Sequence, residues 1–416
     1  MIIYDIFLKC YALGIRLVSL WSVKAQLWLK GRQNIFELLQ DKLPKDNRPL
    51  VWMHCASLGE FEQGRPLLEK IKQAYPNTRI LLTFFSPSGY EIRKHYTGAD
   101  LVAYLPMDGA RNARTFLDTT QPVLAIFVKY ESWFHYLKTL QQRAIPTILV
   151  SAIFTRQQNY FGPMGGFLRR MLNCYTHIFV QDKQSLHLAN IHGVKAPCTI
   201  SGDTRFDRVI EIASQPFSNI LIQEFCQNQT VLVAGSTWKE DEAIIAGFLH
   251  KHPEIKAVIA PHETDESSCR RLLVEFPHAV LLSQAQPSIN PQVQVLIIDS
   301  MGMLSMLYRR ATIAYIGGGF NKSGIHNILE AAVYGKVTVF GPNHNRSAEA
   351  AALIEKGAGF SIASDEPFNQ TMEQLLADKN NLAFRERLAS EYVQGNQGAT
   401  AVILHYINKM GLLPKA

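Results

Sequence analysis

The chain of 416 residues has little cysteine, and its six cysteines are scattered without a Cys-x-x-Cys pair. This usage argues against a disulfide framework and a structural zinc site, and it fits a reducing compartment. No Gly-x-Ser-x-Gly elbow and no Gly-Lys-Ser/Thr phosphate loop occurs, and His262-Glu263 lacks the second histidine of a zinc protease motif. The common serine-hydrolase, P-loop and zinc-protease signatures are therefore missing, and no metal site is expected.

Long apolar runs are also missing from the first thirty residues, which Asp5, Lys9, Arg16 and Lys24 interrupt. A spanning helix needs roughly 20 apolar residues, and no cleavage site for a signal peptide follows. At about 100° per residue, the basic residues share one helix side opposite an apolar side. The apolar side comprises Phe7, Leu17, Val18, Trp21, Ala25 and Trp28. We expect residues 1–32 to form an amphipathic helix in the headgroup region of a membrane. The alternatives are a helix packed on the protein's own core and a bitopic anchor.

The bulk composition is that of a globular protein with two domains. Apolar residues make up 47% of the chain and charged residues 19%, and 416 residues exceed one core of ordinary size. The net charge of +7 is compatible with binding to nucleic acid, to anionic lipid or to an acidic substrate, and the net charge alone does not distinguish these partners.

Short apolar runs alternate with helical patterns and predict parallel strands buried on both faces. A first set of strands is expected at residues 50–54, 79–84, 101–104, 123–127, 147–151 and 177–181, and a second set at 230–234, 257–260, 293–298, 313–316 and 337–340. The fold class is therefore α/β, with two doubly wound Rossmann-like domains and a cleft between them. We expect domains at 33–210 and 211–416, with the last helices, about 380–409, packing back on the first domain.

The glycine-rich segment Tyr315-Ile-Gly-Gly-Gly-Phe320 follows an expected strand, and a helix is expected near His326 or Asn327. Glycines such as Gly318 and Gly319 let the backbone approach a ligand, and a helix start offers N–H groups to a phosphate. Asn327 could cap this helix, and Glu330 could bond a ribose hydroxyl. The alternative is a tight turn without a ligand.

Two polar segments end strands of the first domain. His54-Cys-Ala-Ser-Leu-Gly-Glu60 comes after one strand and contains Ser57, and we expect Glu60 to act as a general base near the start of the next helix. Lys129 and Glu131 follow another strand. They form either a structural ion pair or an acceptor contact.

Three further segments of the second domain follow strands. Ser236, in Gly235-Ser-Thr237, either caps a helix or offers its hydroxyl to a phosphate. His262 comes after the next strand, where a single histidine is usually structural. Met301-Gly302-Met303 lies in a loop and could contact a nucleobase. No Asp-x-Asp occurs, so the usual metal-and-diphosphate site of single-domain glycosyltransferases is missing.

Seven segments in order along the chain resemble the Kdo transferases of lipopolysaccharide synthesis, where Kdo is 3-deoxy-D-manno-octulosonic acid. They are His54-Cys-Ala-Ser-Leu-Gly-Glu60, Thr83-Phe-Phe-Ser-Pro-Ser-Gly89, Tyr130-Glu-Ser-Trp133, Gly202-Asp-Thr-Arg-Phe-Asp207, Gly235-Ser-Thr237, Met301-Gly302, and Gly317-Gly-Gly319 with His326-Asn327 and Leu329-Glu-Ala-Ala332. The resemblance runs from about residue 50 to 345, and the basic, apolar N-terminus also fits it.

The resemblance implies a GT-B fold, CMP-Kdo as the donor and the lipid A precursor as the acceptor. It implies that Glu60 is the general base, and we expect Ser57, Lys129 and Glu131 to act in acceptor or auxiliary roles. It also implies a CMP site in the second domain, with His262, Met301, Gly302, Asn327 and Glu330 around the nucleotide. We expect the CMP-sugar site to include, in addition, Ser236, Thr237, Met303, Gly318 and Gly319. No cofactor, metal or nucleic acid is expected, and the enzyme is expected on the cytoplasmic face of the inner membrane.

The chain departs from the family pattern at three places. Ala260-Pro-His-Glu-Thr264 lacks the arginine that the family often has there, Lys129 stands where a glutamate is common, and Ile325 replaces a glycine. The alternatives are a nucleotide-sugar epimerase on the same scaffold, a transferase using a UDP-sugar, and a membrane-bound protein that binds nucleotide without turnover. Incubation with a nucleotide sugar and no acceptor would identify the epimerase.

Overall fold

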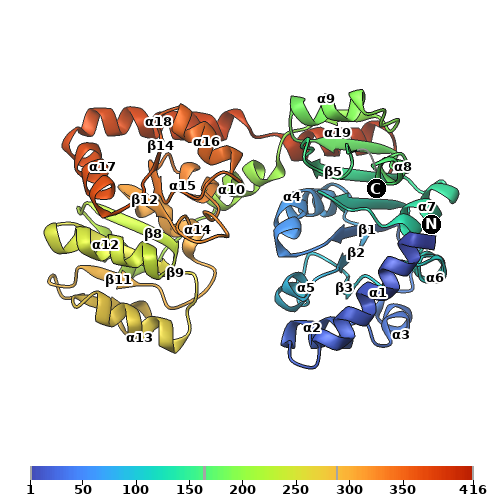
Figure 1. Cartoon of the computed structure of the whole chain (residues 1–416), viewed down its shortest axis with the longest axis horizontal. Coiled ribbons are helices and arrows are strands. Elements are labelled where there is room, and N and C mark those ends of the chain that lie inside the picture. Colours follow the sequence, from blue (N-terminus) through green and yellow to red (C-terminus); the bar gives the residue numbers. More distant parts are fainter. Residues whose placement is uncertain (1, 163–164, 287–288, 415–416) are drawn as a thin grey trace. The chain divides into compact units, whose positions relative to one another are not determined.

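The computed structural model describes residues 2–162, 165–286 and 289–414 and divides the chain into two compact units (Figure 1). Unit 1 comprises Met1–Arg208 with Gln397–Ala416, and unit 2 comprises Val209–Asn396. The boundary between the units lies two residues before the predicted one. Residues 1–32, predicted as a separate segment, belong to unit 1.

Unit 1 is built on a seven-stranded parallel sheet with the order β3-β2-β1-β4-β5-β6-β7. The strands are β1 (Leu50–Cys55), β2 (Arg79–Phe84), β3 (Leu101–Tyr104), β4 (Leu124–Val128), β5 (Thr147–Ala152), β6 (His177–Val180) and β7 (Cys198–Ile200). All residues of β1, β4, β5 and β6 are buried, because helices cover both faces of the sheet.

The helices of unit 1 follow the alternation that the sequence predicts. They are α1 (Ile2–Val18), α2 (Val23–Lys30), α3 (Ile35–Lys42), α4 (Leu58–Ala74), α5 (Pro87–Arg93), α6 (Ala110–Thr120), α7 (Phe134–Gln142), α8 (Gly166–Leu172), α9 (Lys183–Ile191) and α19 (Ala399–Lys409), and α10 (Thr204–Ser214) spans the boundary between the units.

Unit 2 has a second seven-stranded parallel sheet, with the order β10-β11-β9-β8-β12-β13-β14. The strands are β8 (Val231–Thr237), β9 (Lys256–Pro261), β10 (Ala279–Leu281), β11 (Val295–Ile297), β12 (Ile313–Ile316), β13 (Thr338–Phe340) and β14 (Gly359–Ser361). The α-helices are α11 (Ile220–Cys226), α12 (Lys239–Lys251), α13 (Glu266–Glu275), α14 (Leu304–Leu307), α15 (Leu329–Ala332), α16 (Ala348–Glu355), α17 (Asp365–Ala377) and α18 (Lys379–Gly395), and the 3₁₀ turns are η1 (Leu282–Gln284) and η2 (Tyr308–Arg310).

The last helix, α19, packs in unit 1 against α4. Its residues Ile403 and Ile407 are fully buried in the same apolar cluster as Phe61 of α4. Asp207 fixes the start of α19, because its carboxylate accepts the backbone N–H of Gly398 at 2.6 Å and of Thr400 at 2.7 Å. A carboxylate 190 residues earlier in the chain thus caps the returning helix.

Three short strands were missed by the sequence analysis: β7, β10 and β14. Each has three residues and is an edge strand of its sheet, where side chains are partly exposed. A long buried apolar run is therefore not required there, and strands of three residues are too short to be recognised from periodicity. The helix α4 begins at Leu58, with Ser57 at the N-cap position, so that Glu60 lies in its first turn, as expected.

The N-terminal segment forms two helices instead of one. The prediction that Ala25 and Trp28 lie on a lipid-facing side is wrong, since both are buried against unit 1. The segment is also held by polar contacts, in which the Tyr4 hydroxyl donates to Asp108 and Asp5 pairs with His135, each at 2.6 Å. Within the described residues, no helix is long and apolar enough to cross a bilayer.

The cap of α19 generates a stability prediction. Asp207→Ala should lower the free energy of unfolding of unit 1 by about 1–3 kcal/mol, because two N–H groups lose their acceptor. Urea unfolding measures the change. Asp118→Ala is the control, since that carboxylate is 66% exposed in its pair with Arg143. Equal shifts in the two variants would show that the cap does not stabilise the unit.

Candidate functional site

The predicted nucleotide-binding residues of unit 2 come from loops that follow four adjacent strands. The order β11-β9-β8-β12 is continuous within the sheet. Met301-Gly302-Met303 follows β11, His262 follows β9, Ser236 and Thr237 end β8, and Gly318 and Gly319 follow β12. Because all four strands are parallel, their carboxyl ends meet at one edge of the sheet. The fold therefore gathers segments as far apart in sequence as Ser236 and Gly319.

Glycine is required where two of these turns touch. A Cβ added at Gly317 would lie 2.2 Å from the backbone oxygen of Ser236, and one added at Gly319 would lie 2.5 Å from Cα of Gly341. Ser236 itself has φ +54°, a region that a non-glycine residue rarely adopts. Such strain is typical of functional turns. Ser236 does not cap α12, because the N-cap residue is Trp238.

A buried carboxylate that the sequence analysis missed, Asp241, joins the turn after β8 to the turn after β12. Its Oδ2 accepts the backbone N–H of Trp238 and of Gly318, both at 2.9 Å, and its Oδ1 accepts the Tyr315 hydroxyl at 2.8 Å. Burial raises the pKa of Asp241. The Gly318 N–H donates to Asp241, and the amides of Asn321, Ser323 and Gly324 donate within the turn, whereas those of Gly319 and Phe320 donate to no group in the described part of unit 2.

Three rings stack beside these turns. Trp238 lies on His262 with ring centroids 4.4 Å apart, and His262 lies 4.7 Å from His326. Burial, and to a smaller extent electrostatic repulsion from His262, lowers the pKa of His326 to about 4. This ring is therefore neutral at pH 7. Its Nε2 accepts the Trp238 Nε1–H at 3.4 Å, which leaves Nδ1 as the protonated nitrogen. His262 therefore lies between Trp238 and His326, a contact that could not be predicted from its position in the sequence.

The remaining predicted residues of unit 2 differ in what they offer a ligand. Thr237 is buried, and its hydroxyl donates to Glu242 at 3.0 Å. Met301 is 78% exposed beside Gly302, which has φ +94°. Asn327 donates to Glu330 at 3.1 Å. The helix expected from His326 or Asn327 begins only at Leu329 and has four residues, so it supplies no helix dipole of useful length for a phosphate.

In unit 1, Glu60 lies in the first turn of α4, directly after the buried strand β1. Ser57 occupies the N-cap position without a capping hydrogen bond, and its hydroxyl instead donates to the Glu60 carboxylate. Glu60 is partly exposed. A carboxylate oriented by a hydroxyl and open to solvent has the geometry of a proton acceptor.

Glu131 follows β4, the strand next to β1, and is buried with 5% exposure. Its carboxylate lies 3.3 Å from Nε2 of His54 and accepts the Trp133 indole N–H. His54 is itself held by Thr83 through Nδ1 at 2.9 Å. Glu131 thus belongs to an internal polar network and is less accessible than Glu60.

Lys129, between β4 and Glu131, has φ +74°, and its backbone N–H donates to Val150 of β5 at 2.9 Å. Its ammonium lies 5.4 Å from the ring centroid of Tyr130, and no ion pair of Lys129 with Glu131 is formed. The expected structural Lys–Glu pair is therefore not present in the described part of unit 1. The positive φ of Lys129 is a second case of backbone strain at the carboxyl end of a central strand, after Ser236 in unit 2.

Among the described residues, no three His, Cys, Asp or Glu side chains are grouped so that they could hold a metal ion.

Comparison with known proteins gives relatives for most of the chain. The family described as 3-deoxy-D-manno-octulosonic-acid transferase (kdotransferase) matches residues 31–208. The 3-deoxy-D-manno-octulosonic acid transferase of Rickettsia felis is 25% identical, with 87% of this chain and 79% of the relative covered. That of Haemophilus influenzae is 26% identical, with 85% of each chain covered. The resemblance to Kdo transferases, recognised above from seven segments, is confirmed.

The solved structures confirm the predicted GT-B type of fold. The UDP-GlcNAc 2-epimerase from Neisseria meningitidis, bound to UDP-GlcNAc, has a TM-score of 0.61 and 16% identity, with 86% of this chain and 100% of that chain covered. At this identity the likeness concerns the fold of the two α/β domains alone.

The buried ring of His326 generates a pH prediction. Its pKa is about 4 in the folded chain against an ordinary 6.5, so the unfolded chain binds the proton first as pH falls. Stability is therefore fully present above pH 6.5 and should decrease between pH 6.5 and 4. His326→Gln should remove this part of the decrease in urea unfolding measured across that range, whereas His95→Gln, at an exposed histidine, should leave it unchanged. Parallel pH profiles for wild type and His326→Gln would contradict the assignment.

Proposed function

We propose that this relative of the Kdo transferases is an inverting glycosyltransferase that moves Kdo from CMP-Kdo to the lipid A precursor in lipopolysaccharide synthesis. The observation that carries the proposal is the match to transferases of this name along 87% of the chain. A partly exposed glutamate after β1 and a glycine-rich turn after β12 supply the two chemical functions that such a reaction needs.

The acceptor reaction is assigned to Glu60. The carboxylate takes the proton from a lipid hydroxyl while that oxygen forms a bond to the anomeric carbon of Kdo. Glu60 is preferred to Glu131 because Glu131 is buried and its carboxylate already accepts from Trp133. Ser57 orients the base through its hydroxyl. Displacement from the face opposite the leaving group inverts the anomeric configuration.

The donor is assigned to unit 2. As the anomeric C–O bond to phosphate breaks, its electron pair passes to the phosphate of CMP, and the backbone amides of Gly319 and Phe320 stabilise that charge. Asp241 holds these amides in position through Gly318. The Trp238, His262 and His326 rings lie beside them for contact with the nucleotide. The proposal includes no metal or organic cofactor, and transfer that persists in excess EDTA is the expected result.

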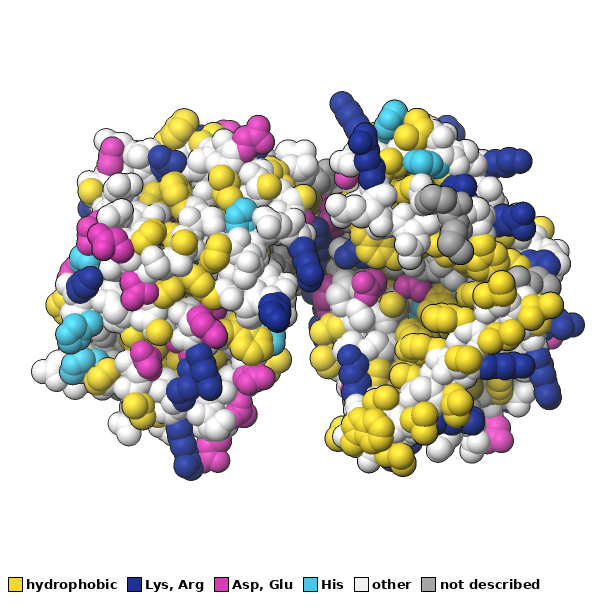
Figure 2. Space-filling model, viewed as in Figure 1, with side chains coloured by type: hydrophobic (Ala, Val, Ile, Leu, Met, Phe, Trp, Pro, Cys, Tyr) yellow, Lys and Arg dark blue, Asp and Glu magenta, His cyan; other side chains and the backbone are white. Residues whose placement is uncertain are grey.

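The membrane contact is assigned to α1 and α2 at the cytoplasmic face of the inner membrane. Figure 2 shows a band of hydrophobic side chains over these helices, with basic side chains beside it. Ile3, Leu20 and Trp21 are 84, 75 and 72% exposed. Patches of this kind are rare on monomers that stay in water. The exposed Lys9, Arg16, Lys24 and Lys30 suit an anionic headgroup layer.

The epimerase remains the alternative, because the GT-B fold is shared with UDP-GlcNAc 2-epimerases. The deciding experiment is mass spectrometry of a lipid A precursor after incubation with CMP-Kdo and the protein. A mass increase by one or more Kdo residues supports the proposal. Conversion of a nucleotide sugar without acceptor, and no change in the lipid, would replace it by the epimerase.

The base assignment predicts the effect of Glu60→Gln. The amide keeps the size of the side chain but cannot take the proton, so kcat should fall about 10²–10⁴-fold. CMP affinity, measured by calorimetry, should stay near that of wild type. Glu37→Gln, at an exposed glutamate of α3, is the matched control and should keep full turnover. If Glu60→Gln retains more than about a tenth of the activity, that estimate does not apply and Glu131 becomes the next candidate.

The membrane assignment predicts that Ile3→Gln, Phe7→Gln and Trp21→Gln together reduce partitioning to anionic vesicles by about tenfold or more, since exposed apolar surface drives interfacial binding. These side chains are largely exposed, so the unfolding midpoint should change little. Substitution is a cleaner test than deletion of the segment, which would also remove the buried Trp28. The control replaces Ile220, Val274 and Phe384, three exposed apolar residues of unit 2, by Gln. Equal vesicle binding by both variants would contradict the assignment.

A further inference from the structure

Arg32, which follows α2, binds three backbone carbonyls from three different segments of unit 1. Its guanidinium donates to the carbonyl oxygens of Phe85 at 2.7 Å, Leu105 at 2.9 Å and Trp28 at 3.1 Å. The same group lies 3.9, 4.8 and 4.9 Å from the ring centroids of Trp28, Phe85 and Tyr104. A planar guanidinium presents its N–H donors in a fixed geometry, so it can bind several carbonyls at once. Arg32 therefore joins α2 to two loops of the sheet.

These two loops follow β2 and β3, which are neighbours in the sheet. The loop after β2 is in turn bound to the loop after β1. The backbone N–H groups of Phe85 and Ser86 both donate to the carbonyl oxygen of Ala56, at 3.2 and 2.7 Å. That carbonyl belongs to the planar peptide bond between Ala56 and Ser57. Arg32 is thus connected to the peptide before Ser57 through a single residue, Phe85.

The position of Ser57 matters because its hydroxyl donates to the carboxylate of Glu60. Glu60 is partly exposed, and among the described residues no other group donates a hydrogen bond to its carboxylate. A shift of the peptide between Ala56 and Ser57 would therefore also shift the group that orients the base. A misplacement of about 1 Å in a reacting group can cost about 10²-fold in rate.

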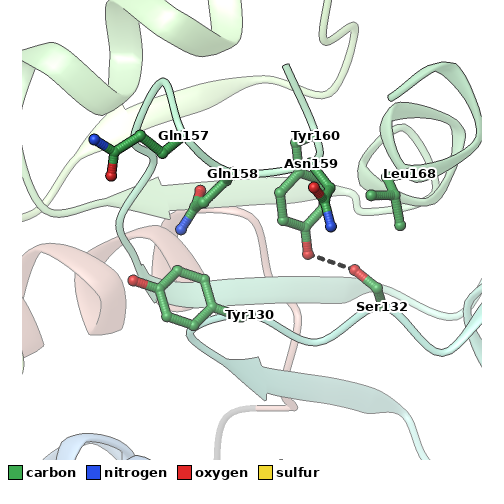
Figure 3. A pocket seen from close by; sticks show the side chains of 7 residues that line it. All are labelled: Tyr130, Ser132, Gln157, Gln158, Asn159, Tyr160 and Leu168. Atoms are coloured by element: carbon green, nitrogen blue, oxygen red, sulfur yellow. Dashed lines mark hydrogen bonds between the residues drawn. The ribbon is translucent and has the colours of Figure 1, made fainter. Parts of the chain in front are cut away.

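The ring of Phe85 extends the connection to the loop after β4. It lies 4.8 Å from the ring centroid of Trp133, whose indole N–H donates to Glu131. Between these two residues, Ser132 shares a hydrogen bond with Tyr160 of the loop after β5 at 2.5 Å, as Figure 3 shows. The loops after five adjacent strands, β3-β2-β1-β4-β5, are therefore linked to one another, and Arg32 binds the first two of them.

We propose that Arg32 is a positioning residue for the transfer reaction, because it holds the loop after β2 against the loop after β1 and thereby keeps Ser57 and Glu60 in place. The inference rests on the proposed function, in which Glu60 is the base. It gives residues 1–32 a second role beside membrane contact, since their last residue then supports the site. Loss of Arg32 should lower turnover even when the acceptor is in detergent micelles, where no bilayer has to be bound.

The test is steady-state kinetics of Kdo transfer by Arg32→Met, with the lipid A precursor in detergent micelles. Methionine keeps an unbranched apolar stem but cannot donate to the carbonyls. The kcat should fall about 10–100-fold, because the base is misplaced. The KM for CMP-Kdo should be unchanged, since the residues assigned to the donor lie in unit 2. A kcat near that of wild type in the folded variant would overturn the proposal.

Arg79→Met is the matched control. Arg79 also belongs to unit 1, its side chain is 12% exposed, and its guanidinium donates to the backbone carbonyls of Arg48 and Pro44. It lies at the start of β2, at the opposite end of the strand from Phe85. Its loss should lower the urea unfolding midpoint and leave kcat near that of wild type. An equal fall of kcat in both variants would show that Arg32 acts only through stability, and the proposal would be rejected.

Hydrogen exchange followed by mass spectrometry tests the connection without a substrate. In Arg32→Met, the peptide with the amides of Phe85 and Ser86 should exchange about tenfold faster or more, because its loop loses a charged donor. Arg79→Met should leave this exchange unchanged. If wild type transfers no Kdo, the proposed function fails, and the exchange alone decides whether Arg32 holds the loop. Equal exchange in wild type and Arg32→Met would overturn the inference.

A milder variant covers the case in which Arg32→Met does not fold. Arg32→Lys keeps the charge and the stem of the side chain but lacks the planar fork that binds three carbonyls. It should change kcat and the exchange of the loop after β2 in the same directions, again with an unchanged KM for CMP-Kdo. Wild-type values of both kcat and exchange in Arg32→Lys would contradict the proposal.

Discussion

The parallel pairing of β11, β9, β8 and β12 places the ends of four strands along one edge of the sheet in unit 2. Everything assigned to the nucleotide depends on this arrangement, because each strand delivers a separate loop to that edge. In unit 1, β1 and β4 pair in the same way and bring Glu60 and Glu131 to neighbouring strand ends. Glu60 and Glu131 are far apart in sequence, but the pairing of β1 with β4 places them at neighbouring strand ends.

Pairing alone would leave the turns free to move, and buried polar groups remove that freedom. Asp241 accepts three hydrogen bonds from two turns and a tyrosine, so the cost of burying its carboxylate is offset by full satisfaction of its oxygens. Glu131 has the corresponding position in unit 1, with His54 and Trp133 as neighbours. Asp241 thus binds backbone N–H groups of two turns, whereas the Glu131 carboxylate contacts the side chains of His54 and Trp133.

The N-terminal helices combine two interfaces that a separate amphipathic segment would not have. Leu8, Ala25 and Trp28 are buried against unit 1, while Ile3 and Trp21 remain exposed. The hydrogen bond of Tyr4 with Asp108 holds α1 in register on the protein. These contacts with the rest of unit 1 determine which apolar residues face outward, so the segment has one buried face and one exposed apolar face.

The sequence by itself determined the α/β class, the two domains and the segments in which the candidate residues lie, because buried parallel strands leave continuous apolar runs and loops leave glycine and polar residues. The resemblance to Kdo transferases could also be recognised from the sequence, because it depends on short segments that occur in a fixed order along the chain. Only the tertiary structure decided that Asp241 links two turns, that Trp238 and His326 enclose His262, and that Glu131 is buried while Glu60 is partly exposed. These properties arise from contacts between segments distant in sequence, and local patterns carry no information about such contacts.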